Sequence, residues 1–256
     1  MRHALAALCL ALSLAAAGCL GIEQTITLHK DLSGTAAMVM SADLEPMVMM
    51  VARMQHEMSG GKGDPPADLI AKAREELLAA KSADPIDVED EKQGLREALP
   101  QGIKLIEASF KDDGLKLVGR FVLGFDKLSM LNAISLDKPG GAAPPGPIDN
   151  PMQRPFEGLT VVEEGGTILI TSPTHNPLAD QAKGGREPLD PMAKSMMDTM
   201  FKGFRVAFRI NAPFDVIEHN AHRQEGTTLV WEYDLASIEK LVTGDAGPAI
   251  RVKYKK

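Results

Sequence analysis

Alternation of apolar and polar residues is the dominant pattern along this chain, and it predicts strands joined by short turns. An alternating segment is followed by a turn, such as Asp31-Leu32-Ser33-Gly34, and then by a second alternating segment. A period of two places the apolar side chains on one face, and a short turn joins antiparallel neighbours. The pattern therefore predicts an antiparallel sheet built from hairpins. The predicted hairpin strands are 22–29, 35–41, 103–110, 115–123, 159–162 and 167–171.

The last quarter of the chain repeats this pattern. Arginines alternate with apolar residues over 204–211, a second apolar face occupies 227–233, and a final strand is predicted at 250–255. These segments supply large side chains of the kind that fill a core. The residues that we expect to be buried are Phe204, Val206, Phe208, Ile210, Leu229 and Trp231.

Helical segments are predicted between the hairpins. Proline and aspartate stand near their starts, as at Pro46 and in Asp64-Pro65-Pro66, which is typical of helix N-termini. Hairpins interrupted by helices are typical of the α+β class, so we expect an antiparallel sheet with helices packed on one face. The predicted helices are 46–58, 67–80, 88–99, 191–202 and 235–242.

Two stretches carry no periodic apolar signal. The first, 137–155, contains six prolines, and the second covers 175–188. Proline interrupts both helices and strand ladders, so both stretches are expected to be loops. Each flank of the first loop contributes only hairpins that would leave a bare sheet face. We therefore expect a single domain over 19–256 with a Pro/Gly-rich insertion at about 137–155.

The first residues have the pattern of a secretory signal peptide. Arg2 and His3 give a weakly basic start, and an uncharged run of mostly Ala and Leu extends to Ala17. This run is too short to cross a bilayer core, which requires about 20 apolar residues. The segment ends in Leu14-Ala15-Ala16-Ala17-Gly18-Cys19, which resembles the bacterial lipobox. That resemblance implies cleavage of 1–18 and acylation of Cys19.

Cleavage after Ala15-Ala16-Ala17 is the alternative, because small residues also fit an ordinary signal-peptidase site. Leu20 follows the cysteine in place of an acidic residue. The lipobox resemblance therefore implies an exported protein that is lipid-anchored in the cell envelope, at the outer membrane facing the periplasm. Cys9 is the other cysteine of the chain, so the mature domain has no thiol for a disulfide, a Cys-zinc site or a Cys nucleophile.

Composition and motifs narrow the functional classes. The chain of 256 residues has 28 basic and 35 acidic residues, and its formal charge is −7. It therefore has no basic excess for binding nucleic acid. It also lacks a Gly-x-Ser-x-Gly elbow, a phosphate-binding Gly-x-x-x-x-Gly-Lys-[Ser/Thr] loop and a dinucleotide fingerprint. We expect a protein that is not an enzyme and uses no cofactor.

The order of these features resembles the LppM-type envelope lipoproteins. The resemblance includes the lipobox, the early turn at Asp31-Leu32-Ser33-Gly34, a helical insertion, a strand before Pro213, and Gly226-Thr227-Thr228-Leu229-Val230-Trp231. It implies a lipid-anchored or membrane-tethered exported domain, in a family of which some members are linked to binding envelope glycolipids, with no catalytic residues to transfer. This chain departs from the family in its methionine-rich segment and in having no C-terminal transmembrane helix.

Methionine is the compositional excess, with 14 in the chain. Two sets recur at helical spacing, which places each set on one face of its predicted helix. The favoured interpretation is core packing, because unbranched thioethers fill irregular space. A hydrophobic groove for an acyl chain or a partner helix, and a Cu(I) site with soft thioether ligands, are the alternatives. The first set is Met47, Met50, Met54 and Met58, and the second is Met192, Met196 and Met200.

His219 and His222 form the one histidine pair in the sequence that merits weighing as a metal site. On a strand, side chains three residues apart point to opposite faces, so a polar hairpin end is the favoured interpretation. Together the features predict a non-catalytic, lipid-anchored envelope lipoprotein that binds or scaffolds, with a lipid or another hydrophobic partner as the candidate ligand. A methionine-rich Cu(I)-binding protein and a hydrolase are the alternative functions.

Overall fold

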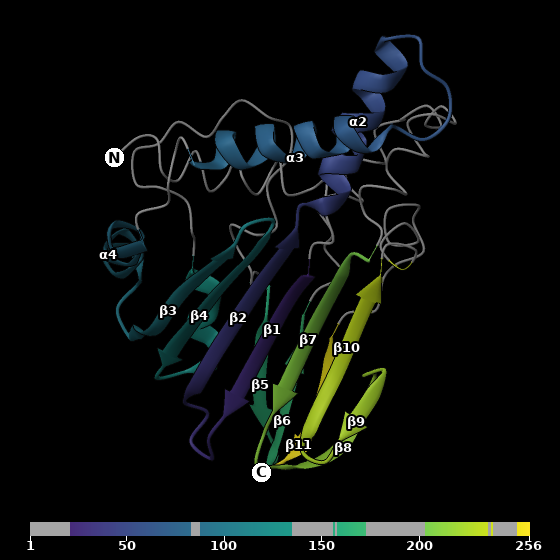
Figure 1. The fold of residues 1–256 in the computed structure, drawn as a ribbon. Coiled ribbons are helices and arrows are strands. Elements are labelled where there is room, and N and C mark those ends of the chain that lie inside the picture. The colour runs from purple at the N-terminus through teal and green to yellow at the C-terminus, as the bar shows by residue number, and fades with distance from the viewer. Residues whose placement is uncertain are drawn as a thin grey trace, which may run out of the picture.

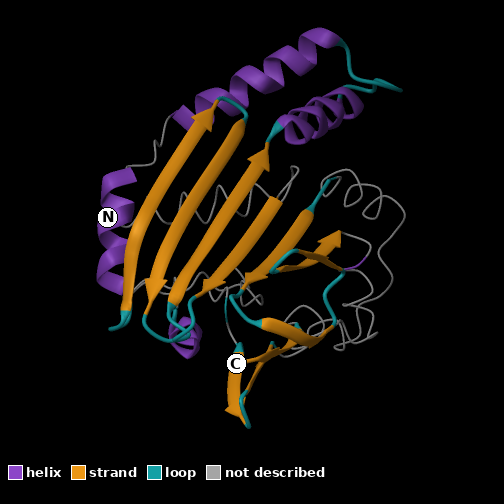
Figure 2. Ribbon diagram, turned by 90° about the horizontal axis from the view of Figure 1, so that it is seen from below, coloured by secondary structure: helices purple, strands orange, loops and turns teal. Residues whose placement is uncertain are grey.

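Two β-sheets stacked on each other form the centre of the described structure (Figures 1 and 2). The computed structural model of this chain describes residues 21–82, 88–134, 156, 158–172, 203–234, 237 and 250–256. The large sheet has seven strands in the order β3 (Ile103–Asp113), β4 (Lys116–Phe125), β2 (Gly34–Asp43), β1 (Gly21–Leu28), β7 (Arg205–Asn211), β10 (Thr228–Asp234) and β9 (Arg223–Glu225). The small sheet has four, in the order β5 (Thr160–Glu164), β6 (Thr167–Thr171), β11 (Arg251–Lys255) and β8 (Asp215–His219).

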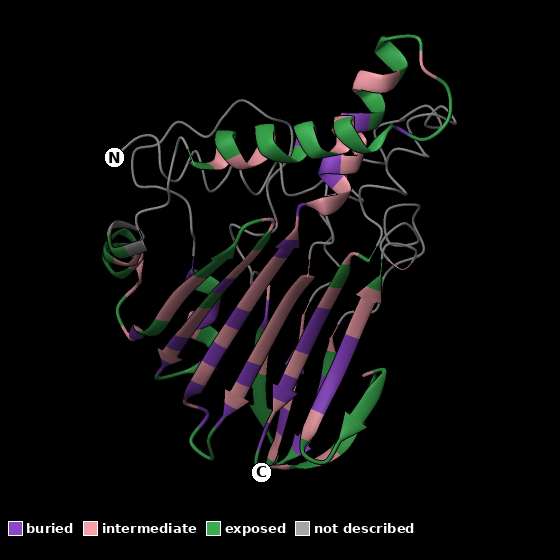
Figure 3. Cartoon of the chain, in the orientation of Figure 1, coloured by how far each residue is buried: buried purple, intermediate pink, exposed green. Residues whose placement is uncertain are grey.

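The main hydrophobic core lies between the two sheets. Ile210 and Trp231 from the large sheet share it with Ile168 and Val252 from the small sheet, and all four are 0% exposed. Phe208 packs edge-on against Trp231, with ring centroids 6.0 Å apart. Along β2, buried positions alternate with half-buried ones from Gly34 to Met38 (Figure 3), as expected when one face of a strand points into the core. In β10, by contrast, the three consecutive residues Leu229, Val230 and Trp231 are all buried.

The predicted buried set is confirmed at four of its positions and is wrong at two. Phe208, Ile210, Leu229 and Trp231 are buried. In contrast, Phe204 and Val206 are only half-buried. Phe204 belongs to a small apolar cluster around Ala42, apart from the main core. The alternation placed both residues on the correct face of the sheet, but it could not show that the main core ends before them.

The α+β class is confirmed, but one pair of neighbouring strands runs parallel. β1 and β7 lie side by side with Ile26 next to Ile210 in a parallel register. Every other paired neighbour in both sheets is antiparallel. Alternation determines which face of a strand is buried, but it does not determine the direction of the neighbour. A purely antiparallel sheet was therefore the wrong expectation for β1 and β7.

The described helices lie mostly around the large sheet. α2 (Glu45–Met58) and α3 (Ala67–Ser82) pair with each other beyond the end of the sheet where β2 ends, and α4 (Val88–Ala98) contacts β3 (Figure 1). Of the helices in the described part of the chain, the short 3₁₀ helix η2 (Leu128–Ala133) is the one whose residues, Leu128 and Leu131, lie in the main core.

The helix arrangement therefore differs in detail from the expectation that helices pack on one face of the sheet. Among the described residues, the inner face of the large sheet is covered chiefly by the small sheet. The reason is that β5 and β6 were predicted as a hairpin of a single sheet. They belong instead to the second sheet, together with β11 and β8, and this sheet packs on the inner face of the first. The predicted insertion at 137–155 and the predicted helix at 191–202 lie outside the described residues, as does the predicted helix at 235–242 except for residue 237.

Local polar contacts fix the turn between β1 and β2. Asp31 accepts hydrogen bonds from the backbone N–H of Ser33 at 3.0 Å and from its hydroxyl at 2.7 Å. These bonds hold the pKa of the Asp31 carboxyl below its usual value. Leu32 adopts a φ of 65°, which is strained for a residue with a branched side chain. Its side chain is buried in the main core, and this burial offsets the strain.

Asn220 joins the two sheets where the chain passes from β8 to β9. Its Oδ1 accepts a hydrogen bond from the Trp231 indole Nε1–H at 2.9 Å and another from the Arg251 backbone N–H at 2.8 Å. Trp231 belongs to the large sheet and Arg251 to the small one. Both partners are donors, which identifies the accepting atom as the amide oxygen. One side-chain atom therefore connects the two layers.

Replacing Asn220 by alanine is expected to lower the free energy of unfolding by about 2 kcal/mol, because a buried indole N–H loses its acceptor. Asn220→Asp retains an oxygen at the same position and should retain most of the stability. Urea denaturation of both variants measures the difference. Equal stability of Asn220→Ala and the parent would show that the link between the sheets contributes nothing.

Tyr254 places a hydroxyl group inside the core. The residue is 0% exposed, and its hydroxyl has no hydrogen-bond partner among the described residues. Burial raises the pKa of Tyr254 above its ordinary value, and it raises the pKa of the less buried Tyr233 to about 12. Both phenols therefore stay neutral in the folded state at a pH where a tyrosine in the unfolded chain ionises.

Tyr254→Phe is expected to raise the free energy of unfolding by about 1 kcal/mol near pH 7, because it removes an unsatisfied buried hydroxyl. A raised folded-state pKa also means that Tyr254 favours unfolding as the pH rises above about 10, the value of an unperturbed tyrosine. The melting temperature of the variant should therefore fall less between neutral and alkaline pH than the melting temperature of the parent. A destabilised variant would indicate that the hydroxyl makes a favourable bond.

Candidate functional site

The structure places the first methionine set along α2 with steadily increasing exposure. Met47 is 5% exposed, Met50 is half-buried, Met54 is 42% exposed and Met58 is 84% exposed. The face of α2 that packs on α3 is formed instead by Val48 and Ala52. Met47 is therefore buried as the core-packing interpretation expects, whereas Met54 and Met58 are exposed to solvent. Cys19 and the second set, Met192, Met196 and Met200, lie outside the described residues.

The spread of this set along α2 limits what it can bind. Met47 and Met58 are eleven residues apart, which corresponds to about 16 Å along a helix axis. Ligands to one copper ion must converge on a point, so the full set cannot form a single Cu(I) site. A groove of about 590 Å³ runs beside α3, and its described lining residues include no methionine. Its described lining residues are Ala67, Ile70, Ala71, Arg74, Glu75, Leu78, Ala79 and Ser82.

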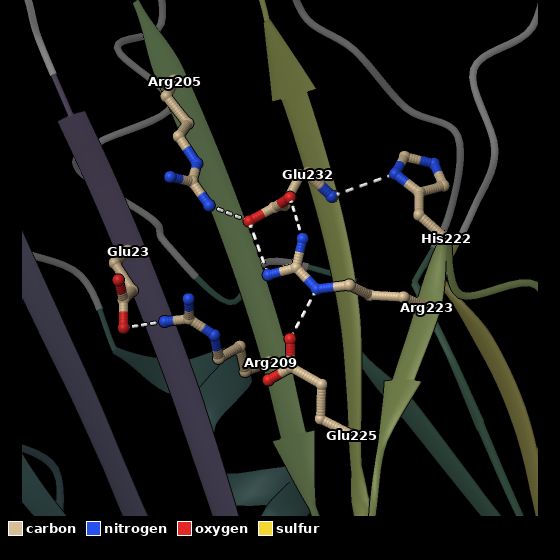
Figure 4. A network of polar contacts seen from close by, with 7 residues as sticks. All are labelled: Glu23, Arg205, Arg209, His222, Arg223, Glu225 and Glu232. Carbon is tan, nitrogen blue, oxygen red and sulfur yellow. Dashed lines mark hydrogen bonds and ion pairs between the residues drawn. The ribbon is translucent and has the colours of Figure 1, made fainter.

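The most extensive polar cluster in the described structure lies on the outer face of the large sheet, opposite the main core (Figure 4). Alternation directs one set of side chains from β1, β7 and β10 away from the small sheet. We call this cluster the outer charge network. It consists of Glu23, Arg205, Arg209, Arg223, Glu225 and Glu232.

Glu232 is the centre of the outer charge network. It is 23% exposed and binds Arg223 through both carboxylate oxygens, with Arg223 Nη2 to Glu232 Oε1 at 3.0 Å. Arg205 reaches the same carboxylate from β7. Arg223 also binds Glu225 at 2.6 Å through Nε, and Arg209 pairs with Glu23 across β7 and β1. The ion pairs therefore connect β1 to β7 and link β7, β10 and β9.

The outer charge network is electrically balanced, with three arginines against three glutamates. Each guanidinium is already paired, so the cluster offers an approaching anion no unpaired positive charge. Its arrangement is suited to stiffening an open sheet face and holding neighbouring strands in register. The sequence marked Arg205 and Arg209 as outward-facing, but their glutamate partners could be found only from the register of the strands.

The two histidines of the pair are held by separate backbone contacts. The Nδ1 atom of His219 accepts a hydrogen bond from Ala221 N at 3.1 Å, and that of His222 accepts one from Glu232 N at 3.0 Å. The His222 ring also meets the Tyr233 ring edge-on at 5.3 Å. These contacts support the interpretation of His219 and His222 as polar residues at the ends of β8 and β9. No group of three or more His, Cys, Asp or Glu positioned for a metal ion occurs in the described part of the chain.

The described helices do not include one with the length and apolar character needed to cross a membrane.

Glu232→Gln is expected to lower the free energy of unfolding by about 1 kcal/mol, because a partly buried carboxylate is shared by two arginines. Glu225→Gln is the matched control, since Glu225 pairs with Arg223 alone and is more exposed. That variant should change stability by only a few tenths of a kcal/mol. Chemical denaturation at low and high salt compares them, and an equal effect of both substitutions would contradict a central role for Glu232.

Comparison with known proteins gives distant structural likenesses and no sequence match. The chain matches no protein-family model and no curated protein sequence. Among solved structures it is similar to the folded domain of LppM from Mycobacterium tuberculosis, determined by NMR. The match has 11% sequence identity and a TM-score of 0.39, and it covers 93% of this chain and 89% of the LppM domain. LppM is thus a distant structural neighbour of this chain.

Proposed function

We propose that this chain is an exported lipoprotein, anchored in the bacterial envelope through acylated Cys19, whose domain is a non-catalytic binding or scaffolding module. The observation that carries the proposal is the position of the lipobox relative to the fold. Cys19 precedes Gly21, the first residue of β1, by two positions. The proposed cleavage site therefore falls directly at the boundary of the folded domain.

The place of β1 in the sheet strengthens this assignment. β1 is the fourth of seven strands, and it pairs with β2 on one side and β7 on the other. Cleavage before Cys19 removes the apolar segment and leaves this central strand intact. Acylation then attaches the sheet to the bilayer at its middle strand, with no long linker.

The polar groups described above take part in structural contacts within the domain. The arginines and glutamates of the outer charge network are paired with one another. His219 and His222 both use Nδ1 to accept backbone N–H groups. General acid–base and nucleophilic catalysis need a reactive group presented to a substrate, and these residues are engaged in structural contacts. A lipid or another hydrophobic partner at the envelope is the ligand class that we propose, with the outer membrane as the location.

Cys19→Ala tests the proposal, and Cys9→Ala is the matched control because it changes the only other cysteine. The parent and Cys9→Ala should appear in the membrane fraction, with mass spectrometry showing an acylated N-terminal Cys19. Cys19→Ala should lose the acyl groups and retain the apolar segment or move to the soluble fraction. An unmodified mature N-terminus at another residue, in cells that acylate other lipoproteins, would refute the proposal.

A further inference from the structure

The distance from the anchor to the fold restricts how the domain sits on a membrane. Two residue steps separate Cys19 from Gly21, so the connection spans at most about 7 Å. Gly21 pairs with Ser41 at the end of β2 and with Arg205 at the start of β7. The end of the large sheet formed by these residues therefore lies within a few ångströms of the bilayer surface when Cys19 is acylated.

The pair formed by α2 and α3 lies beyond this same end of the sheet (Figure 1). β2 ends at Asp43, and α2 begins at Glu45. The 14 residues of α2 extend about 21 Å at 1.5 Å per residue. The helix is thus about three times longer than the tether, and it starts at the same end of the large sheet as Gly21. With so short a connection, acylation of Cys19 would bring this end of the sheet, and the helix pair beyond it, close to the bilayer.

Several contacts fix the helix pair to the sheet, so it cannot simply swing away. Leu44 N donates to Leu115 O at 2.8 Å, next to the turn between β3 and β4. Lys81 at the end of α3 binds the Asp112 carboxylate and the Gly114 carbonyl in the same region. Val48 of α2 is fully buried in a cluster that includes Leu115 at its edge.

The exposed surface of α2 has the chemistry that a bilayer interface accepts. Met58 is 84% exposed, the highest value among the large apolar side chains described, and Met54 is 42% exposed. They lie four residues apart and therefore share one helix face. Flexible thioether side chains adapt to irregular apolar surroundings, and apolar side chains on one helix face bind at the boundary between headgroups and acyl chains. Figure 3 shows the far end of α2 as largely exposed.

Charge does not provide an alternative explanation for this surface. Between Glu45 and Ser82 the chain has five basic and six acidic residues, so the helix pair has no positive excess to attract anionic lipids. The contact would depend on apolar side chains and on the anchor.

We propose that the pair of α2 and α3 is the membrane-contacting surface of this domain, with Met54 and Met58 inserted at the interface of the phospholipid bilayer that holds acylated Cys19. The inference rests on the proposed lipid anchor and adds an orientation to it. The turn between β1 and β2 lies at the other end of β1 and points away from the bilayer. The methionines of α2 thereby form a second, reversible contact with the bilayer, in addition to the lipid anchor, and this contact sets the angle between the large sheet and the membrane.

The test uses site-specific fluorescence on the full lipidated protein, because acylation blocks Cys19 and leaves any introduced cysteine as the single free thiol. Met58→Cys is labelled with nitrobenzoxadiazole and reconstituted into vesicles of phosphatidylethanolamine and phosphatidylglycerol. Ile217→Cys is the matched control, since Ile217 is an exposed apolar residue of the small sheet, and Lys30→Cys reports on the turn between β1 and β2. Mass spectrometry of each preparation establishes acylation of Cys19, and thermal unfolding establishes that each variant folds.

The label at position 58 should shift its emission to shorter wavelength, lose quenching by aqueous iodide and gain quenching by spin-labelled phospholipid. Labels at 217 and 30 should keep aqueous emission. Aqueous signals from all three positions in protein with acylated Cys19 would overturn the proposed orientation and leave the lipid anchor in place. Equal lipid quenching at positions 58 and 217 would overturn it as well. Protein without acylated Cys19 would refute the anchor and the inference together.

Discussion

The apolar contact between the two sheets is the interaction on which the rest of the structure depends. Neither sheet could keep its inner face in water, because Trp231, Ile210, Ile168 and Val252 would all be exposed. Stacking the sheets removes these side chains from solvent, and the Asn220 oxygen satisfies the one polar atom of Trp231 that enters the contact. The core therefore fixes the distance and orientation of the two layers. The outer charge network and the helix pair are arranged around that unit.

The large sheet has two faces with different physical roles. The inner face contributes the stabilising burial, whereas the outer face stays open among the described residues and is ordered by ion pairs around Glu232. Single exposed ion pairs contribute little, but a shared carboxylate restrains several strands at once. Among the described residues, this face is charge-balanced, with three arginines paired to three glutamates. The same balance explains why the cluster is better suited to holding the sheet than to binding an anion.

In the proposed arrangement, the lipid anchor, the central strand and the helix pair together define the orientation of the domain relative to the membrane. β1 begins two residues after Cys19 and lies at the middle of the large sheet. α2 and α3 leave the sheet at the same end, while the turn around Leu32 lies at the other. An anchor on a flexible linker would allow all orientations, but an anchor joined directly to a central strand allows few. In that orientation, the exposed Met58 at the far end of α2 is placed where it can contact the bilayer.

The sequence by itself determined the α+β class and most of the described strands and helices, but not β8, β9 or the 3₁₀ helix η2. These properties follow from local periodicity and turn chemistry, as at Asp31 and in the alternation that buries Phe208 and Trp231. Only the tertiary structure decided the parallel pairing of β1 with β7, the separation into two sheets and the partners of Arg205 and Arg209. It also decided that one methionine stripe begins in the core at Met47 and ends in solvent at Met58. Periodicity shows which side chains share a face, but what covers that face depends on segments far apart in the chain.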